Sequence, residues 1–416
     1  MNSNELIEFI DGSPTPYQGV EQVIIELTKH GFQELHLGNS WNLEYGGKYY
    51  IISGNCAIMA FEIGDNPWDE GFHMIGSHLD SPGFRIKPRA NHPSQSVLTL
   101  NTEVYGGAIL HTWFDRPLSI AGQVILDGEP LKSKKIQFKR PLGIIPSLAI
   151  HMDREVNKGK NWNPQKECLP VFSLEEKDSL EKLLEKEVEG EILDYDLFLY
   201  PMEKSTYLGI NQEFISAPRL DNLAMVHSSL KGLVESKKSK KTKVFFAYNH
   251  EEIGSQTAQG AMGPLGAEIL ERIILSLGGG REDFFRACSK SFLISADMAH
   301  GIHPNYPEVA DPTNRPQLGK GPVIKIAANR SYTSEGHTSA YFKSLCKKAE
   351  VECQTFVNAS NRRGGSTIGP LALTHLNIPG VDVGNPIWGM HSVREIGAMK
   401  DHIDMIKVMK EFYSQS

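Results

Sequence analysis

The sequence has few cysteines and no pairing pattern among them. Its 416 residues include five cysteines, and none belongs to a Cys-x-x-Cys pair. An odd number of scattered cysteines predicts neither a zinc ribbon nor a disulfide framework. A chain without disulfides suits a reducing compartment, so we expect a cytoplasmic protein.

Long apolar runs and a surplus of positive charge are also missing. No apolar run approaches the roughly 20 residues that cross a bilayer. The first eight residues are acidic and lack the basic segment and apolar core of a signal peptide. The formal net charge is -7, and the one basic run, residues 237–243, is typical of an exposed loop. We therefore expect neither a membrane nor a nucleic acid as a partner.

The predicted secondary structure changes in character near residue 84 and again after residue 216. After residue 216 helices and strands alternate, with helices predicted near 264–276 and 281–289 and strands at 244–248 and 291–296. Such alternation predicts an α/β fold with a mixed, mostly parallel sheet and helices on both faces. The first 83 residues supply further helices and strands, among them a helix at 16–30.

Residues 84–216 form a β-rich insert between these parts. Gly and Pro separate its strand-like runs, and a Ser173–Glu176 capping box predicts one helix after them. The predicted strands are 97–105, 109–113, 119–126, 134–138 and 148–151.

The strand predicted at 244–248 leads directly into Asn249, His250, Glu251 and Glu252. Adjacent side chains of a strand point to opposite faces, so two neighbouring carboxylates cannot share one face. At the end of a strand they can serve one site in two roles, one holding a metal ion and the other moving a proton. Taken alone, the pair is more simply explained as a solvated turn.

Other segments place polar residues at similar positions. His78 and Asp297 follow predicted apolar strands, Asp221 starts a helix, and His391 follows a glycine-rich segment. In open α/β sheets, sites form outside the carboxyl ends of the strands. A helix cap would explain Asp221, and a hydrogen-bonded loop would explain His391. Taken together, these residues predict a shared metal site.

The residue types indicate which metal and how many ions. His, Asp and Glu without Cys favour zinc or a similar divalent ion at a catalytic site. Five ligands are too many for one tetrahedral ion with an open position, whereas two ions ~3.5–4 Å apart with a bridging carboxylate would use them. Three carboxylates and a bridging hydroxide would balance the charge of two ions. We expect two zinc ions, with cobalt or manganese as alternatives.

Six motifs contain these residues or lie between them. They are Ser-His-Leu-Asp-Ser-Pro (77–82), Pro-Arg-Leu-Asp-Asn (218–222), Asn-His-Glu-Glu-Ile-Gly-Ser (249–255), Asp-Met-Ala-His-Gly-Ile-His-Pro-Asn-Tyr (297–306), Gly-Ser-Thr-Ile-Gly-Pro (365–370) and Met-His-Ser-Val-Arg-Glu (390–395). Together they resemble the aspartyl aminopeptidase / vacuolar aminopeptidase I family of metallopeptidases, and they occur in the family's order. The resemblance implies a catalytic metallopeptidase domain over residues 1–83 and 217–416. It also implies that the insert, 84–216, serves dimerisation and assembly.

The resemblance assigns metal ligands. Asp221 would bridge the two ions, and the peptide bond after it is expected to be cis. The terminal ligands would be His78 and Asp297 for one ion, and Glu252 and His391 for the other.

It also assigns the proton transfers. Asp80 would lie behind His78 and fix its tautomer. Glu251 would be the general base, taking a proton from the metal-bridging water and passing it to the leaving amine.

Substrate contacts are implied as well. His300, Lys325 and Tyr332 match substrate-binding positions of the family, and the lysine would favour an acidic N-terminal residue. The backbone of residues 365–369 would line the substrate mouth. His151 of the insert would reach a neighbouring subunit's active site, within a tetrahedral dodecamer built from dimers.

Two departures from the family's pattern bear on specificity. Gly365 stands where the family often has cysteine, and Trp388 lies two residues before Met390, in a segment where a Gln-Leu-Ala type of stretch is common. The sequence thus predicts a metal-dependent aminopeptidase acting on N-terminal Asp or Glu, with neutral or apolar residues as the alternative. A carboxypeptidase or deacylase on the same scaffold, and a non-catalytic shell protein, are the rival hypotheses.

Overall fold

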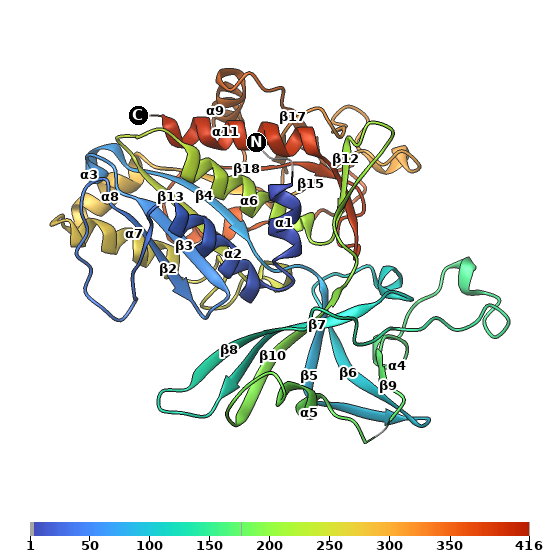
Figure 1. Cartoon of the computed structure of the whole chain (residues 1–416). Coiled ribbons are helices and arrows are strands. Elements are labelled where there is room, and N and C mark those ends of the chain that lie inside the picture. The colour runs from blue at the N-terminus through green and yellow to red at the C-terminus, as the bar shows by residue number, and fades with distance from the viewer. Residues whose placement is uncertain (1–3, 176, 416) are drawn as a thin grey trace. The chain divides into compact units, whose positions relative to one another are not determined.

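The computed structural model describes residues 4–175 and 177–415, which divide into two compact units (Figure 1). The first takes in the chain up to Asp80, Ser205–Met390 and the chain from Glu395 onward. The second consists of Ser81–Lys204 together with the four residues His391–Arg394. Residues 205–217 belong to the first unit because β11 (Thr206–Leu208) and β12 (Phe214–Ala217) form a small sheet with β20 (Glu395–Ala398).

The first unit is built on a mixed, mostly parallel sheet, as predicted. The four central strands, β13, β4, β14 and β18, are parallel, and antiparallel pairs occur nearer the edges. Across the described part of the chain the order is β1 (Gln33–Glu34), β2 (Lys48–Ser53), β3 (Ala57–Glu62), β13 (Thr242–Tyr248), β4 (Phe72–His78), β14 (Phe292–Ala296), β18 (Gly380–Gly384), β16 (Val323–Ile326) and β17 (Gln354–Val357).

Helices cover both faces of this sheet, so its central strands are buried on both sides. In β13, Phe245 and Ala247 pack into one apolar core, whereas Val244, Phe246 and Tyr248 pack into the other. This double burial explains why the sequence of β13 is continuously apolar. The first core contains α1 (Glu5–Asp11), α2 (Pro16–Lys29), α6 (Leu220–Glu235), α9 (Gly336–Lys348) and α11 (Met399–Ser414). The second contains α7 (Leu265–Ser276), α8 (Arg281–Ser289) and α10 (Ile368–Ala372).

The second unit is an antiparallel sheet with its own apolar core. The strand order is β8 (Lys132–Gln137), β7 (Leu118–Leu126), β10 (Ile192–Pro201), β5 (Gly83–Ser94), β6 (Val97–Tyr105) and β9 (Val171–Ser173). Its core includes Phe84, whose ring meets that of Trp113 edge-on at 5.2 Å, and Val393 from the short 391–394 segment.

Two predicted strands of this unit are wrong. Residues 109–113 contain a 3-10 helix, η1 (Leu110–Trp113), whose tight turn buries Trp113 against Phe84. Residues 148–151 form no strand, and their side chains are exposed instead of packing on a sheet.

The predicted helix of the insert begins later than expected. Ser173 ends β9, and the helix is the short α5 (Leu180–Leu184), capped by the Ser179 hydroxyl, which accepts the Lys182 N–H at 3.1 Å. Glu176, the other half of the predicted capping box, lies outside the described residues.

The basic run 237–243 contributes partly to the fold. Lys241 donates to the carbonyl oxygens of Glu70 and Lys290. Lys243 is buried in β13, 3.3 Å from Glu62. The expectation of an exposed loop is therefore wrong for Lys243, which lies inside the strand. None of the helices within the described residues is long and apolar enough to span a membrane.

Two buried histidines join α6 to α11. His227 Nδ1 lies 3.0 Å from His402 Nε2, and both rings are buried. Burial lowers the pKa of His402 to about 3. Burial, together with His402 and Lys231, lowers the pKa of His227 well below its usual value. Both side chains are therefore neutral in the folded protein.

We expect this pair to make stability depend on pH. Each histidine takes up a proton on unfolding below about pH 6.5, so the free energy of unfolding should fall by about 1.4 kcal/mol per pH unit for each histidine that is still neutral in the folded protein, which for His402 holds down to about pH 3. The stabilisation is complete above pH 6.5. Urea unfolding at pH 7 and pH 5 should show a smaller loss in His402→Gln than in the unchanged protein. His36→Gln, at an exposed position, is the control. Equal losses in all three proteins would contradict the assignment.

Candidate metal centre

Three adjacent parallel strands deliver polar groups to one edge of the sheet. β4 ends at His78, which pairs in register with Tyr248 at the end of β13. The chain after β13 turns through η3 (Glu251–Ile253), and β14, on the other side of β4, is followed by Asp297. The carboxyl ends of neighbouring parallel strands thus converge, which is the usual place for a site in an open α/β sheet.

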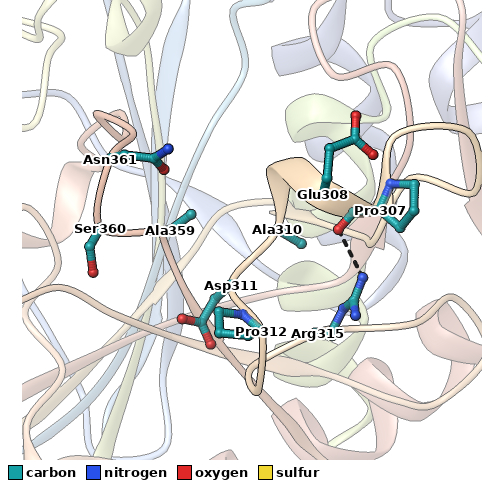
Figure 2. A pocket seen from close by; sticks show the side chains of 9 residues that line it. All are labelled: Pro307, Glu308, Ala310, Asp311, Pro312, Arg315, Ala359, Ser360 and Asn361. Carbon is teal, nitrogen blue, oxygen red and sulfur yellow. Dashed lines mark hydrogen bonds between the residues drawn. The ribbon is translucent and has the colours of Figure 1, made fainter.

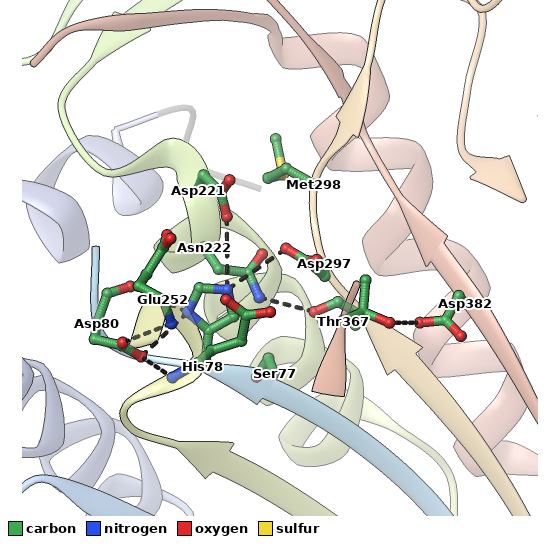
Figure 3. A network of polar contacts seen from close by, with 12 residues as sticks. Ser77, His78, Asp80, Asp221, Asn222, Glu252, Asp297, Met298, Thr367 and Asp382 are labelled. Atoms are coloured by element: carbon green, nitrogen blue, oxygen red, sulfur yellow. Dashed lines mark hydrogen bonds and ion pairs between the residues drawn. The ribbon is translucent and has the colours of Figure 1, made fainter. Parts of the chain in front are cut away.

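The predicted ligands of the first unit lie close together (Figure 3). His78 Nε2 is 3.6 Å from Asp221 Oδ1 and 3.5 Å from Asp297 Oδ1. One candidate ligand atom from each of these three residues lies within 4.8 Å of the others, and the same holds for His78 with Glu251 and Glu252. The five side chains therefore form one cluster that could hold metal.

Asp80 orients both the histidine and the turn that bears the glutamates. His78 Nδ1 lies 3.1 Å from the Asp80 carbonyl oxygen and 3.4 Å from its carboxylate Oδ1. Nε2 is thereby left to face Asp221 and Asp297. The Asp80 carboxylate also accepts the backbone N–H groups of Glu251 and Glu252 at 3.2 and 3.1 Å. The sequence analysis predicted the contact with His78 but missed this second task.

Asp221 is held by two residues to which the sequence analysis gave no role. Its backbone N–H donates to Glu395 Oε2 at 2.9 Å. The peptide bond to Asn222 is cis, as expected, and the Asn222 amide donates to the Ala296 carbonyl at 2.9 Å. Both residues lie inside the motifs that carried the family resemblance, so position within a motif was the available signal.

Burial and crowding shift the pKa values of these carboxylates. Burial and nearby acids raise the pKa of Asp221 and of Glu252 well above the usual range. Burial, with Asp297 and Asp80, raises the pKa of Glu251 to about 7 despite the opposing effect of His78. Burial alone would lower the pKa of His78, but hydrogen bonding to Asp297 and Asp80 raises it.

This arrangement fits a divalent cation. Buried carboxylates that repel one another need a compensating positive charge, and their donor set of carboxylate oxygens and imidazole nitrogen suits zinc. Asp297 has a cationic partner in addition to His78. The ammonium of Lys325 lies 3.1 Å from Asp297 Oδ2 and, together with His78, outweighs burial, so the pKa of Asp297 is lowered.

The predicted substrate-binding residues of the first unit lie beside Asp297. Lys325 Nζ donates to Asp297 and to the Met298 carbonyl, each at 3.1 Å, and lies 5.3 Å from the centre of the Tyr332 ring. Tyr332 shares a small apolar cluster with Phe356, whose ring meets that of His300 at 5.6 Å.

The remaining two predicted site residues belong to the second unit. His391 has a left-handed backbone (φ 68°), and its Nδ1 lies 3.1 Å from the Gly107 carbonyl oxygen. His151 lies in an exposed turn between β8 and η2 (Val156–Lys158).

A separate open pocket of about 750 Å³ shares no residue with the cluster (Figure 2). Its lining includes Asp311 and Arg315, the latter donating to the Pro307 carbonyl at 2.8 Å. Hydrogen bonds from Asn314 and Thr313 lower the pKa of Asp311 to about 2. A carboxylate satisfied in this way has no evident catalytic task, so the pocket's size does not make it the reactive site.

Comparisons with known proteins agree with the geometry. Residues 9–413 match the family model described as Aminopeptidase I zinc metalloprotease (M18). The chain is 51% identical to the "Probable M18 family aminopeptidase 2" of Clostridium novyi, over 99% of this chain and 98% of the relative.

Solved structures give the same result. A chain in the cryo-EM structure of the Ape4 and Nbr1 complex has a TM-score of 0.95 and 35% identity, over 99% of this chain and 85% of that one. The structure of the S. cerevisiae mApe1 dodecamer has a TM-score of 0.85 and 26% identity, over 99% and 96%. The chain belongs to the M18 family of zinc metallo-aminopeptidases.

Proposed function

We propose that this aminopeptidase holds two divalent metal ions and removes acidic N-terminal residues from peptides. The observation that carries the proposal is the crowding of Asp221, Glu252 and Asp297 around His78 at the ends of three parallel strands. So many buried and half-buried acids around one imidazole exceed what a single ion with an open coordination position would need.

The ligand set divides between two ions. His78 and Asp297 would hold one zinc ion, Glu252 and His391 the other, and Asp221 would bridge them. Cobalt or manganese would suit the same donors. When bound, the ions supply a polarised carbonyl and a water of lowered pKa.

Glu251 is the proposed general base. Its pKa of about 7 suits a group that both accepts and returns a proton near neutral pH. Asp80 fixes the backbone of this residue beside the cluster, so its carboxylate can take a proton from the attacking water and deliver it to the leaving amine.

Substrate selection is assigned to His300, Lys325 and Tyr332. The buried Lys325 ammonium is the cationic group next to the cluster, which supports an acidic N-terminal side chain. One observation favours the alternative of a neutral or apolar residue: Asp297 already compensates much of the charge of this lysine.

We further propose that the protein works in the cytoplasm as a tetrahedral dodecamer built from dimers, with His151 entering a neighbouring subunit's site. The solved mApe1 dodecamer supports the assembly. So does the exposure of Leu148 and Met152, whose side chains are 53% and 77% exposed on either side of His151. All five cysteines are free thiols, in keeping with a reducing compartment, and cell fractionation would check this location.

We expect the purified protein to release free aspartate from Asp-peptides faster than leucine or alanine from matched peptides. Chelator should abolish release, and zinc, cobalt or manganese should restore it. A kinetic panel of aminoacyl substrates at defined metal loading measures the preference. Faster release of leucine would leave an aminopeptidase but reject acidic selectivity. Cleavage of only C-terminal or N-acylated substrates would favour a carboxypeptidase or deacylase, and no turnover at all would favour a shell protein.

Glu251→Gln should keep two metal ions per chain and lose turnover by about 10²–10⁴-fold, since it removes only the proton-transfer group. Metal analysis and initial rates measure the two effects. Glu252→Gln is the matched control, and it should lose metal because it removes a ligand. Activity of Glu251→Gln close to that of the unchanged protein would rule out the general-base role.

The native mass in solution should be twelve times the 46.3 kDa of one chain. His151→Ala should assemble normally yet turn over substrate at least about tenfold more slowly, as expected for loss of one polar contact to the reacting group. Light scattering and rates test both points, with Lys158→Ala from the same exposed segment as control. A fully active monomer would contradict the proposed assembly.

A further inference from the structure

Asp382 is a buried carboxylate to which the proposed chemistry gives no role. It lies in β18, beside β14, and its side chain has no exposure to solvent. Burying a carboxylate is costly unless hydrogen bonds compensate for the lost water. Its contacts therefore indicate what the residue does.

The carboxylate joins two segments that are distant in sequence. Oδ2 accepts the backbone N–H of Thr333 at 2.6 Å and its hydroxyl at 2.7 Å. Oδ1 accepts the hydroxyl of Thr367 (Figure 3). Breaking a buried hydrogen bond leaves a polar group without a partner, which costs more than breaking an exposed one, so both segments are held at these points.

Both segments carry elements of the proposed substrate site. Thr333 directly follows Tyr332 in the sequence, and the Tyr332 ring lies 5.3 Å from the Lys325 ammonium. Thr367 lies within residues 365–369, the proposed substrate mouth. The two segments also contact each other, because the Ser366 hydroxyl donates to the Ser331 carbonyl at 3.3 Å.

Close packing at Gly369 adds to this anchor. A Cβ atom at this position would lie 2.8 Å from Asp382 Oδ2 and 2.9 Å from the Cβ of Ser295. Only glycine therefore lets the backbone of the mouth approach the carboxylate so closely. The mouth segment is thus buried at residues 367–369, whereas residues 360–366 before these are exposed.

We propose that Asp382 is a positioning residue for the substrate's N-terminal residue, acting through Tyr332 and the backbone of 365–369. It does not touch the substrate. By holding both segments in place before binding, it reduces the conformational entropy that they would lose when a peptide binds. The inference rests on the proposed function, because it assumes that these two segments bind the peptide.

The sharpest test compares two substitutions at one position. Thr367→Val removes the hydroxyl that binds Asp382 while keeping the shape of the side chain, and Thr367→Ser keeps the hydroxyl. We expect Thr367→Val to raise KM about tenfold, with kcat changed less than about threefold and metal content unchanged, since it loosens substrate binding without altering the reacting groups. Thr367→Ser keeps the donor to Asp382, so its rise in KM should be clearly smaller than that of Thr367→Val. Asp382→Asn should raise KM at least as much as Thr367→Val.

Asp401→Asn controls for general loss of stability. Asp401 is another buried carboxylate that fixes a loop, accepting the backbone N–H groups of Gly319 and Gly321 at 2.7 Å each. If Asp401→Asn loses as much thermal stability as Thr367→Val, its KM should still lie within about twofold of that of the unchanged protein. An unchanged KM in Thr367→Val, or an equal rise in Asp401→Asn, would overturn the proposal.

A second measurement separates this inference from the proposed function. If the unchanged protein cleaves no aminoacyl substrate, the proposed function fails. The anchor is then tested by hydrogen exchange of residues 331–335 and 365–369, which should be faster in Thr367→Val than in Thr367→Ser. Equal exchange would overturn the anchor itself, whatever the protein's activity.

Discussion

Repulsion among buried and half-buried carboxylates is the interaction on which the rest of this site depends. Glu252 and Asp297 follow strand ends that the two apolar cores hold in place, and Asp221 joins them from the start of α6. The surrounding groups each offset part of this electrostatic repulsion. Lys325 pairs with Asp297, and His78 is turned by Asp80 so that its second nitrogen faces the acids. The negative charge that remains favours a bound divalent cation.

The adjacent glutamates show how a short turn can bring two neighbouring carboxylates to one cluster. A strand would place their side chains on opposite faces, but the chain has already left β13 and entered η3. There the Asp80 carboxylate accepts both backbone N–H groups, so it fixes the backbone position of two successive residues. The sequence analysis predicted different roles for the two glutamates, but it predicted Asp80 only as a partner of His78 and not as the acceptor for this turn.

Apolar patterning was enough to predict the main sheet and the edge where the site lies. The helix at 281–289 and the strand before Asp297 have nearly their predicted bounds, because the helix buries one continuous face and the strand is buried along its whole length. Short apolar runs were less informative. Residues 109–113 are as apolar as a strand, yet no partner strand takes up their hydrogen bonds in the described fold, and Trp113 packs better from a tight turn. The role of Asp382 could not be predicted, since its partners at 333 and 367 are set by tertiary structure.

The segment His391–Arg394 has a consequence for the evolution of the chain. It leaves the first unit for four residues, places Val393 in the apolar core of the second, and returns at Glu395, which binds the backbone of Asp221. Because of this return, the β-rich unit is not encoded by a single uninterrupted stretch. Its exchange by recombination at one pair of breakpoints would leave Val393 without its native neighbours, so the two units are constrained to diverge together.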